Sequence, residues 1–397
     1  GRNCAAKPRP AGDIPVADMS ERRRARILFL IPEDWYVCSH RLPLLRGAAA
    51  AGHEVVVATR VADHAGPILA TGAELVPIKQ RRGFRGPLQE LAGLRELIGV
   101  YRRQRPDLAH HVTPKSVIFG TLAARAARVP CVVNAMAGLG FVFTSSSAKA
   151  RLLSGPITLA LRVLLRGRRT RLIVQNADDA TFFRDRIGVP AAAVATIRGA
   201  GVDVGAFTPA ATEPAGPLRV VLVARMLADK GIHETVAAAR LLRARRDDIR
   251  ILLAGRGDPE NPAAIAQEQL DAWAAEGVVE VLGHVQDVTA LLRSCHIALL
   301  PSYREGLPKS LLEAAACGLP IVAADVPGCR EICRDGVNGL LVPARSAAPI
   351  AAAIERLADD PALRRAMGAA SRRLAVDEFA EEIVVAATMA LYAELLG

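Results

Sequence analysis

Residues 26–59 read RILFLIPEDWYVCSHRLPLLRGAAAAGHEVVVAT, and this stretch decides the fold class of the chain. Residues 26–31 form a short apolar run that predicts a buried strand, and residues 54–59 predict a second one. Residues 34–40 are expected to form a loop, and residues 41–51 a helix that a glycine terminates. A strand, a loop, a helix and a second strand in this order open a doubly wound parallel sheet.

The alternation of strands and helices continues along the chain and restarts once. A segment rich in Pro, Gly and Thr at residues 208–217 is the expected hinge, and a strand at residues 219–224 opens the second half. We therefore predict an α/β protein with two Rossmann-like, doubly wound domains that face a cleft. The expected parts are a disordered leader at 1–25, an N-terminal domain at 26–207, a C-terminal domain at 208–375, and a final helix at 376–397 that packs back on the N-terminal domain.

The composition is that of a globular protein with an anionic partner. Of the 397 residues, 51% are hydrophobic and 23% are charged, and the formal net charge is +11. A basic chain favours nucleic acid, anionic lipid or a phosphorylated substrate, but no zinc-finger, RNP-like or leucine-zipper pattern is present. We therefore expect no nucleic-acid partner and favour lipid headgroups and diphosphates. An Arg-rich composition without functional meaning is the alternative.

Cysteine usage and hydropathy indicate where the protein acts. The seven cysteines are odd in number and form no C-x-x-C, which argues against a disulfide framework and a zinc site, and for a reducing compartment. The longest uncharged stretch, residues 129–148, is too polar and broken to span a bilayer, and no signal peptide is apparent. The sequence thus predicts a cytoplasmic protein.

The strongest functional motif is EGLPKSLLE at residues 305–313, which follows an expected strand and opens an expected helix. A helix start presents free N–H groups and a positive dipole, which suit a diphosphate. Glu305 precedes the helix and Glu313 lies on its first turns, so the two carboxylates can bind hydroxyls on different parts of one extended ligand. A helix with two unrelated acidic residues is the plainer interpretation, which Gly306 and Pro308 within the motif disfavour.

A second motif supplies two cations. Arg225 and Lys230 lie in RMLADKG at residues 225–231, between an expected strand and a helix, where doubly wound folds bind ligands. Together they can neutralise a departing nucleotide diphosphate. Two solvated surface charges are the alternative, and the glutamate pair makes that alternative weaker.

Two glycine-containing loops give weaker signals. Gly255-Arg-Gly-Asp258 follows an expected strand, and glycines there let the backbone approach a base or ribose, although a plain turn explains the motif equally well. In Gly283-His-Val285, backbone groups can read a nucleobase edge, although a lone histidine such as His284 is more often structural.

In this order the four motifs resemble family 4 retaining glycosyltransferases of the GT-B fold, over nearly the whole chain and most closely at residues 219–343. The resemblance implies that Arg225 and Lys230 bind the donor diphosphate. It also implies that Glu305 contacts the transferred sugar and that Glu313 contacts the ribose hydroxyls. The further residues implied in donor binding are Gly306, Leu307, Gly255, Arg256, His284 and Val285.

The N-terminal half resembles a narrower subgroup through SHRLP at residues 39–43, HHVTPK at 110–115 and NAMAGLG at 134–140. Its members build lipid-linked bacterial surface glycans, such as capsule or O-antigen, and are similar to the N-acetylgalactosaminyltransferase acting on undecaprenyl-diphospho-bacillosamine. The resemblance implies a nucleotide-sugar donor, with UDP as the expected nucleotide, and a polyprenyl-diphosphate-linked glycan acceptor. The implied acceptor-binding residues are His40, Arg41, His110, His111 and Lys115.

The chain departs from the family pattern at two places. Many members carry Gly-Gly in the first N-terminal loop, where this chain reads WYVCSH at residues 35–40. Many also carry a histidine where this chain has Met136. His110, His111 or Lys115 are candidates to hold the sugar in its place.

The expected reaction breaks the bond between the anomeric carbon and the diphosphate. No two aspartates are separated by a single residue, so the chain lacks an Asp-x-Asp motif for Mg²⁺ or Mn²⁺. We therefore expect no metal and no cofactor, with the cations and the helix start stabilising the leaving group. The resemblance implies front-face substitution, with Glu305 fixing sugar hydroxyls rather than acting as a nucleophile.

Residues 151–171 (RLLSGPITLALRVLLRGRRTR) combine Leu-rich turns with six arginines. An apolar face with basic flanks suits an anionic membrane surface, although a core-facing helix with a solvated edge is an equal alternative. We expect a peripheral location on the inner face of the plasma membrane. Two other functions stay open: a GT-B sugar-nucleotide epimerase, and a non-catalytic nucleotide-sugar-binding partner subunit.

Overall fold

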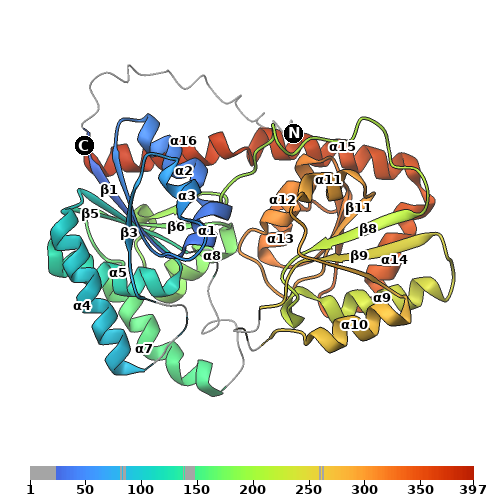
Figure 1. Ribbon diagram of the computed structural model, residues 1–397, viewed down its shortest axis with the longest axis horizontal. Helices are drawn as coiled ribbons and strands as arrows, with labels where there is room; N and C mark the ends of the chain where they lie inside the picture. The colour runs from blue at the N-terminus through green and yellow to red at the C-terminus, as the bar shows by residue number, and fades with distance from the viewer. Residues whose placement is uncertain are drawn as a thin grey trace, which may run out of the picture.

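A computed structural model describes residues 24–80, 83, 86–136, 138, 148–258, 261 and 263–397, without the side chains of 148–153. Most of the leader predicted at 1–25 lies outside these residues. The described chain forms two domains, each built on a parallel sheet with helices on both faces (Figure 1). The fold class is therefore the predicted one.

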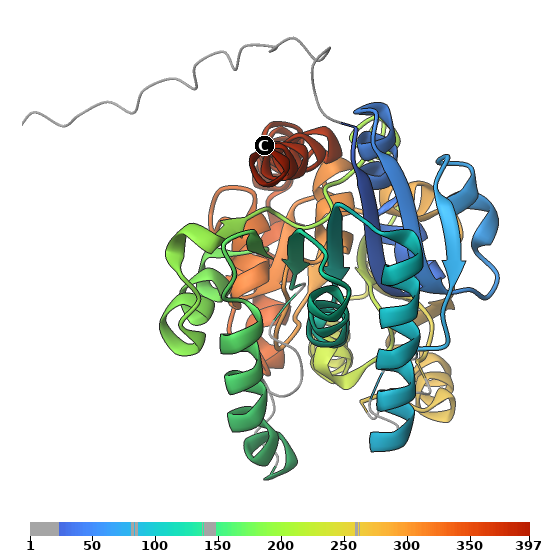
Figure 2. The same cartoon turned by 90° about the vertical axis from the view of Figure 1, so that its left-hand side faces the viewer.

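The N-terminal sheet has the strand order β3-β2-β1-β4-β5-β6-β7. Apolar runs on both faces explain why its central strands are buried throughout. Its strands are β1 (Arg26–Glu33), β2 (Glu54–Arg60), β3 (Glu74–Pro77), β4 (Leu108–Val112), β5 (Cys131–Ala135), β6 (Thr170–Val174) and β7 (Val194–Thr196). Its helices are α1 (Asp34–His40), α2 (Leu42–Ala50), α3 (Ala65–Leu69), α4 (Pro87–Gln104), α5 (Pro114–Ala127), α7 (Ala148–Leu164) and α8 (Ala177–Thr181). Figure 2 shows α4, α5 and α7 side by side over one face.

The C-terminal sheet repeats the plan with the order β10-β9-β8-β11-β12-β13. Its strands are β8 (Leu218–Val223), β9 (Ile249–Ala254), β10 (Glu280–Gly283), β11 (Ile297–Leu300), β12 (Ile321–Ala324) and β13 (Gly339–Val342). Its helices are α9 (Ile232–Arg243), α10 (Gln267–Glu276), α11 (Val288–Arg293), α12 (Lys309–Ala316), α13 (Pro327–Ile332), α14 (Ala347–Asp359) and α15 (Pro361–Glu378). In both sheets the strand order reverses next to the first strand, at β1/β4 and at β8/β11, and such switch points form ligand crevices.

The last helix, α16 (Glu381–Leu396), returns to the N-terminal domain and packs against α2. Val384, Leu391 and Tyr392 on this helix are buried in the same apolar cluster as β1 and β4. In Figure 1, α15 and α16 (red) run one after the other along both domains. The chain passes between the domains twice, and the two passing segments hydrogen-bond to each other. The Val202 N–H donates to Phe379 O at 2.9 Å, and the Glu381 N–H donates to Val202 O at 3.1 Å.

The segment expected as a hinge, residues 208–217, is held on the C-terminal domain. The Arg293 Nε donates to Thr208 O at 2.8 Å, and the Arg364 Nε donates to Glu213 Oε1 at 2.8 Å. The crossing between the domains therefore precedes this segment, at Val202.

Local expectations were wrong in a few places. Residues 34–40 form helix α1 rather than a loop, and the buried Asp34 at its start accepts a hydrogen bond from the Trp35 N–H at 2.7 Å. Helix α8 is followed directly by a π-helix at Phe182–Ile187. Short helices such as α11 and α13 span fewer than two turns and carry too little periodicity to be found from sequence.

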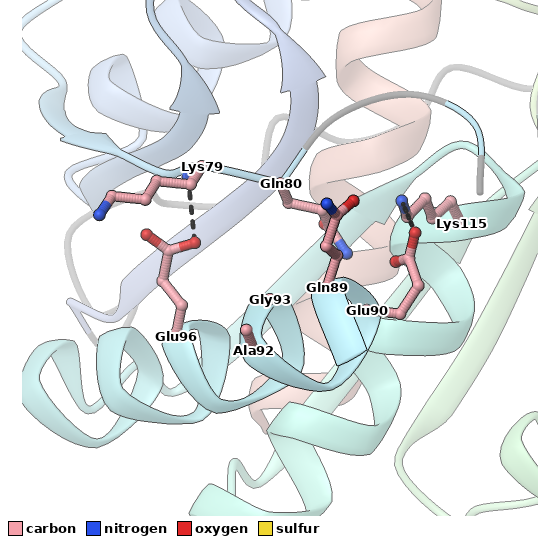
Figure 3. A pocket seen from close by; sticks show the side chains of 8 residues that line it. All are labelled: Lys79, Gln80, Gln89, Glu90, Ala92, Gly93, Glu96 and Lys115. Atoms are coloured by element: carbon pink, nitrogen blue, oxygen red, sulfur yellow. Dashed lines mark hydrogen bonds and ion pairs between the residues drawn. The ribbon is translucent and has the colours of Figure 1, made fainter. Parts of the chain in front are cut away.

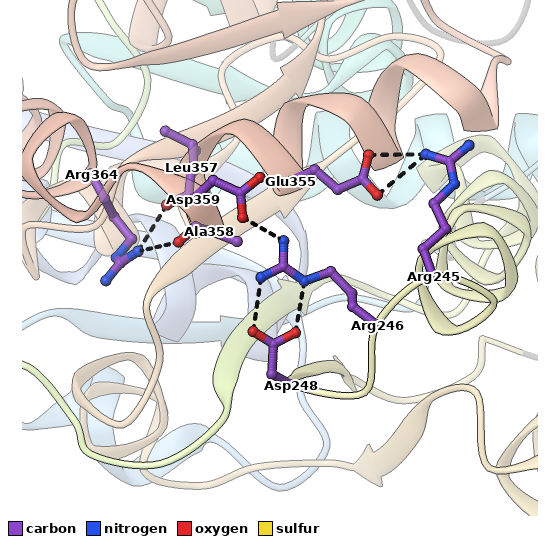
Figure 4. Close-up of polar contacts among 8 residues, drawn as sticks. All are labelled: Arg245, Arg246, Asp248, Glu355, Leu357, Ala358, Asp359 and Arg364. Atoms are coloured by element: carbon purple, nitrogen blue, oxygen red, sulfur yellow. Dashed lines mark hydrogen bonds and ion pairs between the residues drawn. The ribbon is translucent and has the colours of Figure 1, made fainter.

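Surface ion pairs link α14 to the turn that follows α9 (Figure 4). Arg246 contacts Asp248 and Asp359, both at 2.7 Å, and Arg245 contacts Glu355 at 3.0 Å. Exposed pairs of this kind contribute about 1 kcal/mol or less each, so the apolar cluster beneath them stabilises this domain far more. Among the described residues, none of the helices combines the length and apolarity that crossing a bilayer requires.

Candidate active site

The two switch points face each other across a cavity of about 400 Å³ between the domains. The carboxyl ends of parallel strands share one edge of each sheet, so the loops after β1, β4 and β6 meet the loops after β8 and β11. The lining residues of the N-terminal domain are Pro32, Glu33, Trp35, Tyr36, His40, Thr113 and Gln175. Those of the C-terminal domain are Val223, Ala224, Arg225, Lys230, Leu300 and residues 305–310.

Lys230 and Glu305 form an ion pair at this cavity. The Lys230 Nζ lies 2.5 Å from Glu305 Oε1, and the two side chains are 18% and 11% exposed. The Ser302 hydroxyl donates to the same oxygen at 2.7 Å. Gly231 follows Lys230 and has φ +74°. It lets this loop pack closely against Pro301, since a Cβ there would lie 2.3 Å from Pro301 O. The structure thus brings together the cation and the carboxylate that the sequence placed 75 residues apart.

Arg225 lines the same cavity from the loop after β8. Its guanidinium forms an ion pair with Asp258 at 2.5 Å, and its side chain is 41% exposed. Asp258 belongs to the loop after β9, so the GRGD motif positions Arg225. The sequence did not anticipate this contact, because the spacing of two loop residues carries no information on pairing.

The loop at residues 305–310 leads into α12, and Pro308 is the N-cap. The backbone N–H groups of Leu311 and Leu312 bond to Pro308 O, which leaves those of Lys309 and Ser310 at the cavity. Such groups suit an anionic ligand. Lys309 is a cation that the sequence analysis did not select, and its Nζ donates to Ser39 O of the other domain at 2.5 Å.

Glu313 lies one turn further along α12, behind Lys309. Its side chain is 14% exposed and 3.5 Å from the Lys309 Nζ. Burial raises the pKa of this carboxyl, and the charge of Lys309 partly offsets that shift. Glu313 does not line the 400 Å³ cavity, so its contact with a ribose stays a prediction.

The loops with the two glycine motifs lie side by side. The Gly255 N–H donates to Gly283 O at 2.7 Å, and the Met226 N–H donates to Arg256 O at 2.9 Å. Gly255 has φ +150°, and a Cβ there would lie 1.7 Å from Ala224 O. Arg256 and His284 are exposed, and Val285 packs partly on the core. Donor binding by these residues stays a prediction.

Direct contacts between the domains hold the loop at residues 304–306. Asn176 caps α8 through its Oδ1, while its Nδ2 donates to Gly306 O at 2.9 Å. Arg304 forms an ion pair with the buried Asp179 at 3.1 Å. Burial raises the pKa of Asp179, and Arg304 partly offsets that shift. The sequence did not predict Asn176, Asp179 or Arg304 at the site, because their partners come from the other domain.

Of the predicted acceptor residues, His40 lines the cavity. Its ring stacks on Tyr36 with centroids 4.4 Å apart, and its Nδ1 lies 2.6 Å from the Ser39 hydroxyl. Burial lowers the pKa of His40 to about 3, helped by the charges of Lys309 and Arg41. Arg41 is only 6% exposed and does not line the cavity.

His110 and His111 are core residues that do not line the cavity, which argues against the acceptor role predicted for them. They are 1% and 0% exposed, because β4 lies between β1 and β5 with both faces covered. The His110 Nδ1 bonds to the Tyr392 hydroxyl, and the His111 Nδ1 lies 2.8 Å from Asn134 Oδ1. Burial lowers the pKa of both imidazoles, that of His111 to about 4.

Lys115 faces a different cavity of about 690 Å³, between α4 and the end of β3 (Figure 3). Its Nζ donates to Glu90 Oε1 at 2.8 Å and to Gly83 O at 2.6 Å. Met136, at the family histidine position, is 1% exposed and packs in the core. Neither residue lines the interdomain cavity.

Thr113 was not anticipated at the site. It follows β4 as the N-cap of α5 and lies at the cavity with φ +86°, a conformation that costs a β-branched residue about 1–3 kcal/mol. No sequence signal marks it, because Thr ordinarily favours extended backbone.

Known proteins with similar sequences are glycosyltransferases. An alpha-1,3-N-acetylgalactosaminyltransferase of Campylobacter jejuni, named for the acceptor N,N'-diacetylbacillosaminyl-diphospho-undecaprenol, is 28% identical over 89% of this chain and 95% of its own. The putative glycosyltransferase EpsD of Bacillus subtilis is 29% identical over 88% of this chain and 92% of its own.

Solved structures share the fold. Sucrose-phosphate synthase of Thermosynechococcus elongatus superposes with a TM-score of 0.78 at 21% identity, over 94% of this chain and 99% of its own. Anabaena HepE, solved with UDP, gives a TM-score of 0.74 at 19% identity, over 93% and 100%.

Two family models match the two domains in turn. The first, described as "Glycosyl transferase 4-like", matches residues 26–176, and the second, described as "Glycosyl transferases group 1", matches residues 217–360. The chain therefore belongs to the GT-B glycosyltransferases, with a 4-like N-terminal half and a group 1 C-terminal half.

Proposed function

We propose that this transferase moves a hexose or N-acetylhexosamine, with retention of configuration, from a UDP-sugar to a polyprenyl-diphosphate-linked glycan in surface polysaccharide assembly. The observation that carries the proposal is the cluster of Arg225, Lys230 and Glu305 at one cavity beside the start of α12. Cations and helix N–H groups suit the diphosphate, and the carboxylate suits sugar hydroxyls.

In this mechanism the bond between the anomeric carbon and the donor phosphate breaks, and its electron pair stays on the phosphate. Lys230 and Arg225 stabilise the resulting negative charge. The acceptor hydroxyl adds to the same face of the anomeric carbon, and its proton passes to the departing phosphate oxygen. Glu305 holds sugar hydroxyls and takes no covalent part.

The acceptor class is supported by the C. jejuni transferase, which is named for a diphospho-undecaprenol substrate and aligns with nine-tenths of this chain. UDP as the nucleotide is supported by the fold of HepE, which was solved with UDP. Both supports come from similar proteins, so the donor and the acceptor of this chain need direct tests.

We propose that the reaction needs no metal ion. The sequence lacks Asp-x-Asp, and Arg225 and Lys230 line the cavity where leaving-group charge would develop. Transfer rates should be equal with EDTA and with added Mg²⁺ or Mn²⁺. A rate that falls with EDTA and recovers with either ion would contradict this point.

We also propose that α7 touches the membrane. Leu159 and Val163 on this helix are 62% and 53% exposed, and Arg168 and Arg169 beyond its end are exposed as well. Exposed apolar side chains beside cations suit an anionic bilayer surface. The double variant Leu159→Glu/Val163→Glu should co-sediment less with phosphatidylglycerol vesicles. Equal sedimentation of both proteins would exclude this contact.

The central test is transfer from a panel of UDP- and GDP-sugars to one acceptor probe, a short-chain water-soluble polyprenyl diphosphate carrying one N-acetylated hexose. Mass spectrometry should show one added sugar with a UDP donor, and NMR should show the anomeric configuration of the donor. Epimerised UDP-sugar without transfer would indicate the epimerase alternative. Donor binding without any reaction would indicate the non-catalytic alternative.

A further inference from the structure

Helix α1 presents aromatic side chains to the interdomain cavity. Trp35, Tyr36 and His40 line it from the N-terminal domain, while Arg225, Lys230 and Glu305 line it from the C-terminal domain. The helix occupies the stretch where the sequence reads WYVCSH, so the aromatic character belongs to the segment between β1 and α2 of this chain.

The rings have a defined geometry. Tyr36 and His40 lie one helical turn apart, and their rings stack at 4.4 Å with an angle of 5° between their planes. The Trp35 indole meets the Tyr36 ring edge-on, at 5.7 Å and 78°. Trp35 is 37% exposed and lines the cavity.

The helix that carries these rings is anchored. Asp34 is 1% exposed, and its Oδ2 accepts hydrogen bonds from the backbone N–H groups of Ala62 at 2.6 Å and His64 at 3.0 Å. Burial raises the pKa of this carboxyl, but hydrogen bonds from the backbone N–H groups of Ala62, His64 and Trp35 outweigh burial and lower the pKa overall. The aromatic surface is therefore held in place before any ligand arrives, which reduces the entropy lost on binding.

A sugar ring fits such a surface, because it has an apolar C–H face and a rim of hydroxyls. Aromatic rings bind the face, and polar groups at their edges bind the rim. His40 supplies such an edge as a neutral imidazole that can exchange one hydrogen bond with a hydroxyl.

We propose that Trp35, Tyr36 and His40 form the subsite for the terminal sugar of the acceptor, packing its apolar face on the Trp35 indole and directing its hydroxyl toward the Lys230–Glu305 pair. This inference rests on the proposed function and assigns the acceptor its place in the cavity. A uracil base could also stack on Trp35, but the cations that suit the diphosphate come from the C-terminal domain, which favours a nucleotide bound on that side.

Fluorescence separates the two ligands, because the chain has only two tryptophans, Trp35 and Trp273. Trp273 lies in α10 of the C-terminal domain, away from the cavity, so Trp273→Phe leaves Trp35 as the sole reporter. We expect saturable quenching or a blue shift with the acceptor probe, and little change with UDP alone. An equal response to UDP would overturn the assignment in favour of the base.

Kinetics give the second test. Trp35→Ala should raise the KM for the acceptor probe at least tenfold and leave the donor KM and UDP affinity unchanged, and Trp35→Phe should recover most of the loss. Leu241→Ala is the matched control, since Leu241 is 38% exposed on the C-terminal domain. An unchanged acceptor KM in Trp35→Ala would overturn the subsite while transfer by the unaltered protein still supported the proposed function. Absence of both transfer and UDP binding in the unaltered protein would overturn both.

Discussion

The Nζ atom of Lys230 lies 2.5 Å from the Oε1 atom of Glu305, so the cation predicted for the diphosphate and the carboxylate predicted for the sugar neutralise each other before a donor binds. Both side chains are largely buried, and a lone charge at either position would be costly. A donor that brings phosphate charge to Lys230 and hydroxyls to Glu305 can satisfy both groups at once.

Lys230→Ala should lower kcat/KM for transfer by about 100- to 1,000-fold, the cost of removing one preorganised group that stabilises developing charge. It should also weaken UDP binding, measured by calorimetry. Arg240→Ala is the matched control, because its exposed pair with Glu276 lies outside the cavity. Normal UDP affinity in Lys230→Ala would refute the diphosphate role.

Glu305→Gln should separate sugar from phosphate recognition. The glutamine keeps the shape but leaves Lys230 without its counter-charge, so UDP should bind as well as before or more tightly. Transfer should be lost, because the carboxylate that holds the hydroxyls is gone. A variant that transfers at a near-normal rate would remove Glu305 from the catalytic residues.

Asn176→Ala should lower kcat about tenfold with little effect on UDP affinity, because the Asn176 Nδ2 holds Gly306 O across the domain boundary. The same change also removes the cap of α8, worth about 1 kcal/mol of folding stability. Asn176→Ser controls for this, since serine caps well but lacks the amide donor. Full activity in Asn176→Ser would assign the residue to capping alone.

The fold was predictable because each strand is a short apolar run and each long helix is periodic, as in residues 26–59. The C-terminal site residues were predictable because strand ends share one edge of a parallel sheet, which brought Arg225, Lys230 and Glu305 to one cavity. Contacts between the domains were beyond the same reasoning, because no local pattern shows that Asn176 meets Gly306.

His110 and His111 show why residue type alone is a poor guide to a binding site. His110 and His111 suggested sugar binding, yet β4 is a central strand whose two faces are covered, and both side chains are in the core. An apolar residue on each side, as in Leu108-Ala-His-His-Val112, is the signal that could have indicated burial.

The buried His111 predicts lower stability in acid. Its pKa is about 4 in the folded chain and about 6.5 in an unfolded one, so its contribution is complete above pH 6.5 and is lost as the pH falls toward 4. The free energy of unfolding should lose about 2 kcal/mol from this residue between pH 7 and pH 5. Urea titrations should show a shallower dependence for His111→Gln and an unchanged one for the exposed His284→Gln. Parallel curves for all three proteins would contradict the assignment.

The two glycines of the GRGD motif should respond oppositely to alanine, although they are two residues apart. Gly255 has φ +150°, and a Cβ there would fall 1.7 Å from Ala224 O, which belongs to the backbone and cannot rotate away. Gly255→Ala should therefore cost more than about 3 kcal/mol of stability, since it adds a steric clash to a backbone conformation that alanine avoids. Because Ala224 directly precedes Arg225, any chain that still folds should also bind UDP more weakly.

Gly257→Ala is the matched control, because a Cβ at Gly257 meets no atom of the described residues within 4 Å. This change should alter stability by less than about 1 kcal/mol, because alanine there acts mainly by reducing the entropy of the unfolded chain. Thermal and urea unfolding of the two variants give a direct comparison. Equal losses of stability in Gly255→Ala and Gly257→Ala would mean that the motif needs glycine for backbone flexibility. A loss confined to Gly255→Ala would mean that it serves through the close contact that sets the loop of Arg225 against the loop of Asp258.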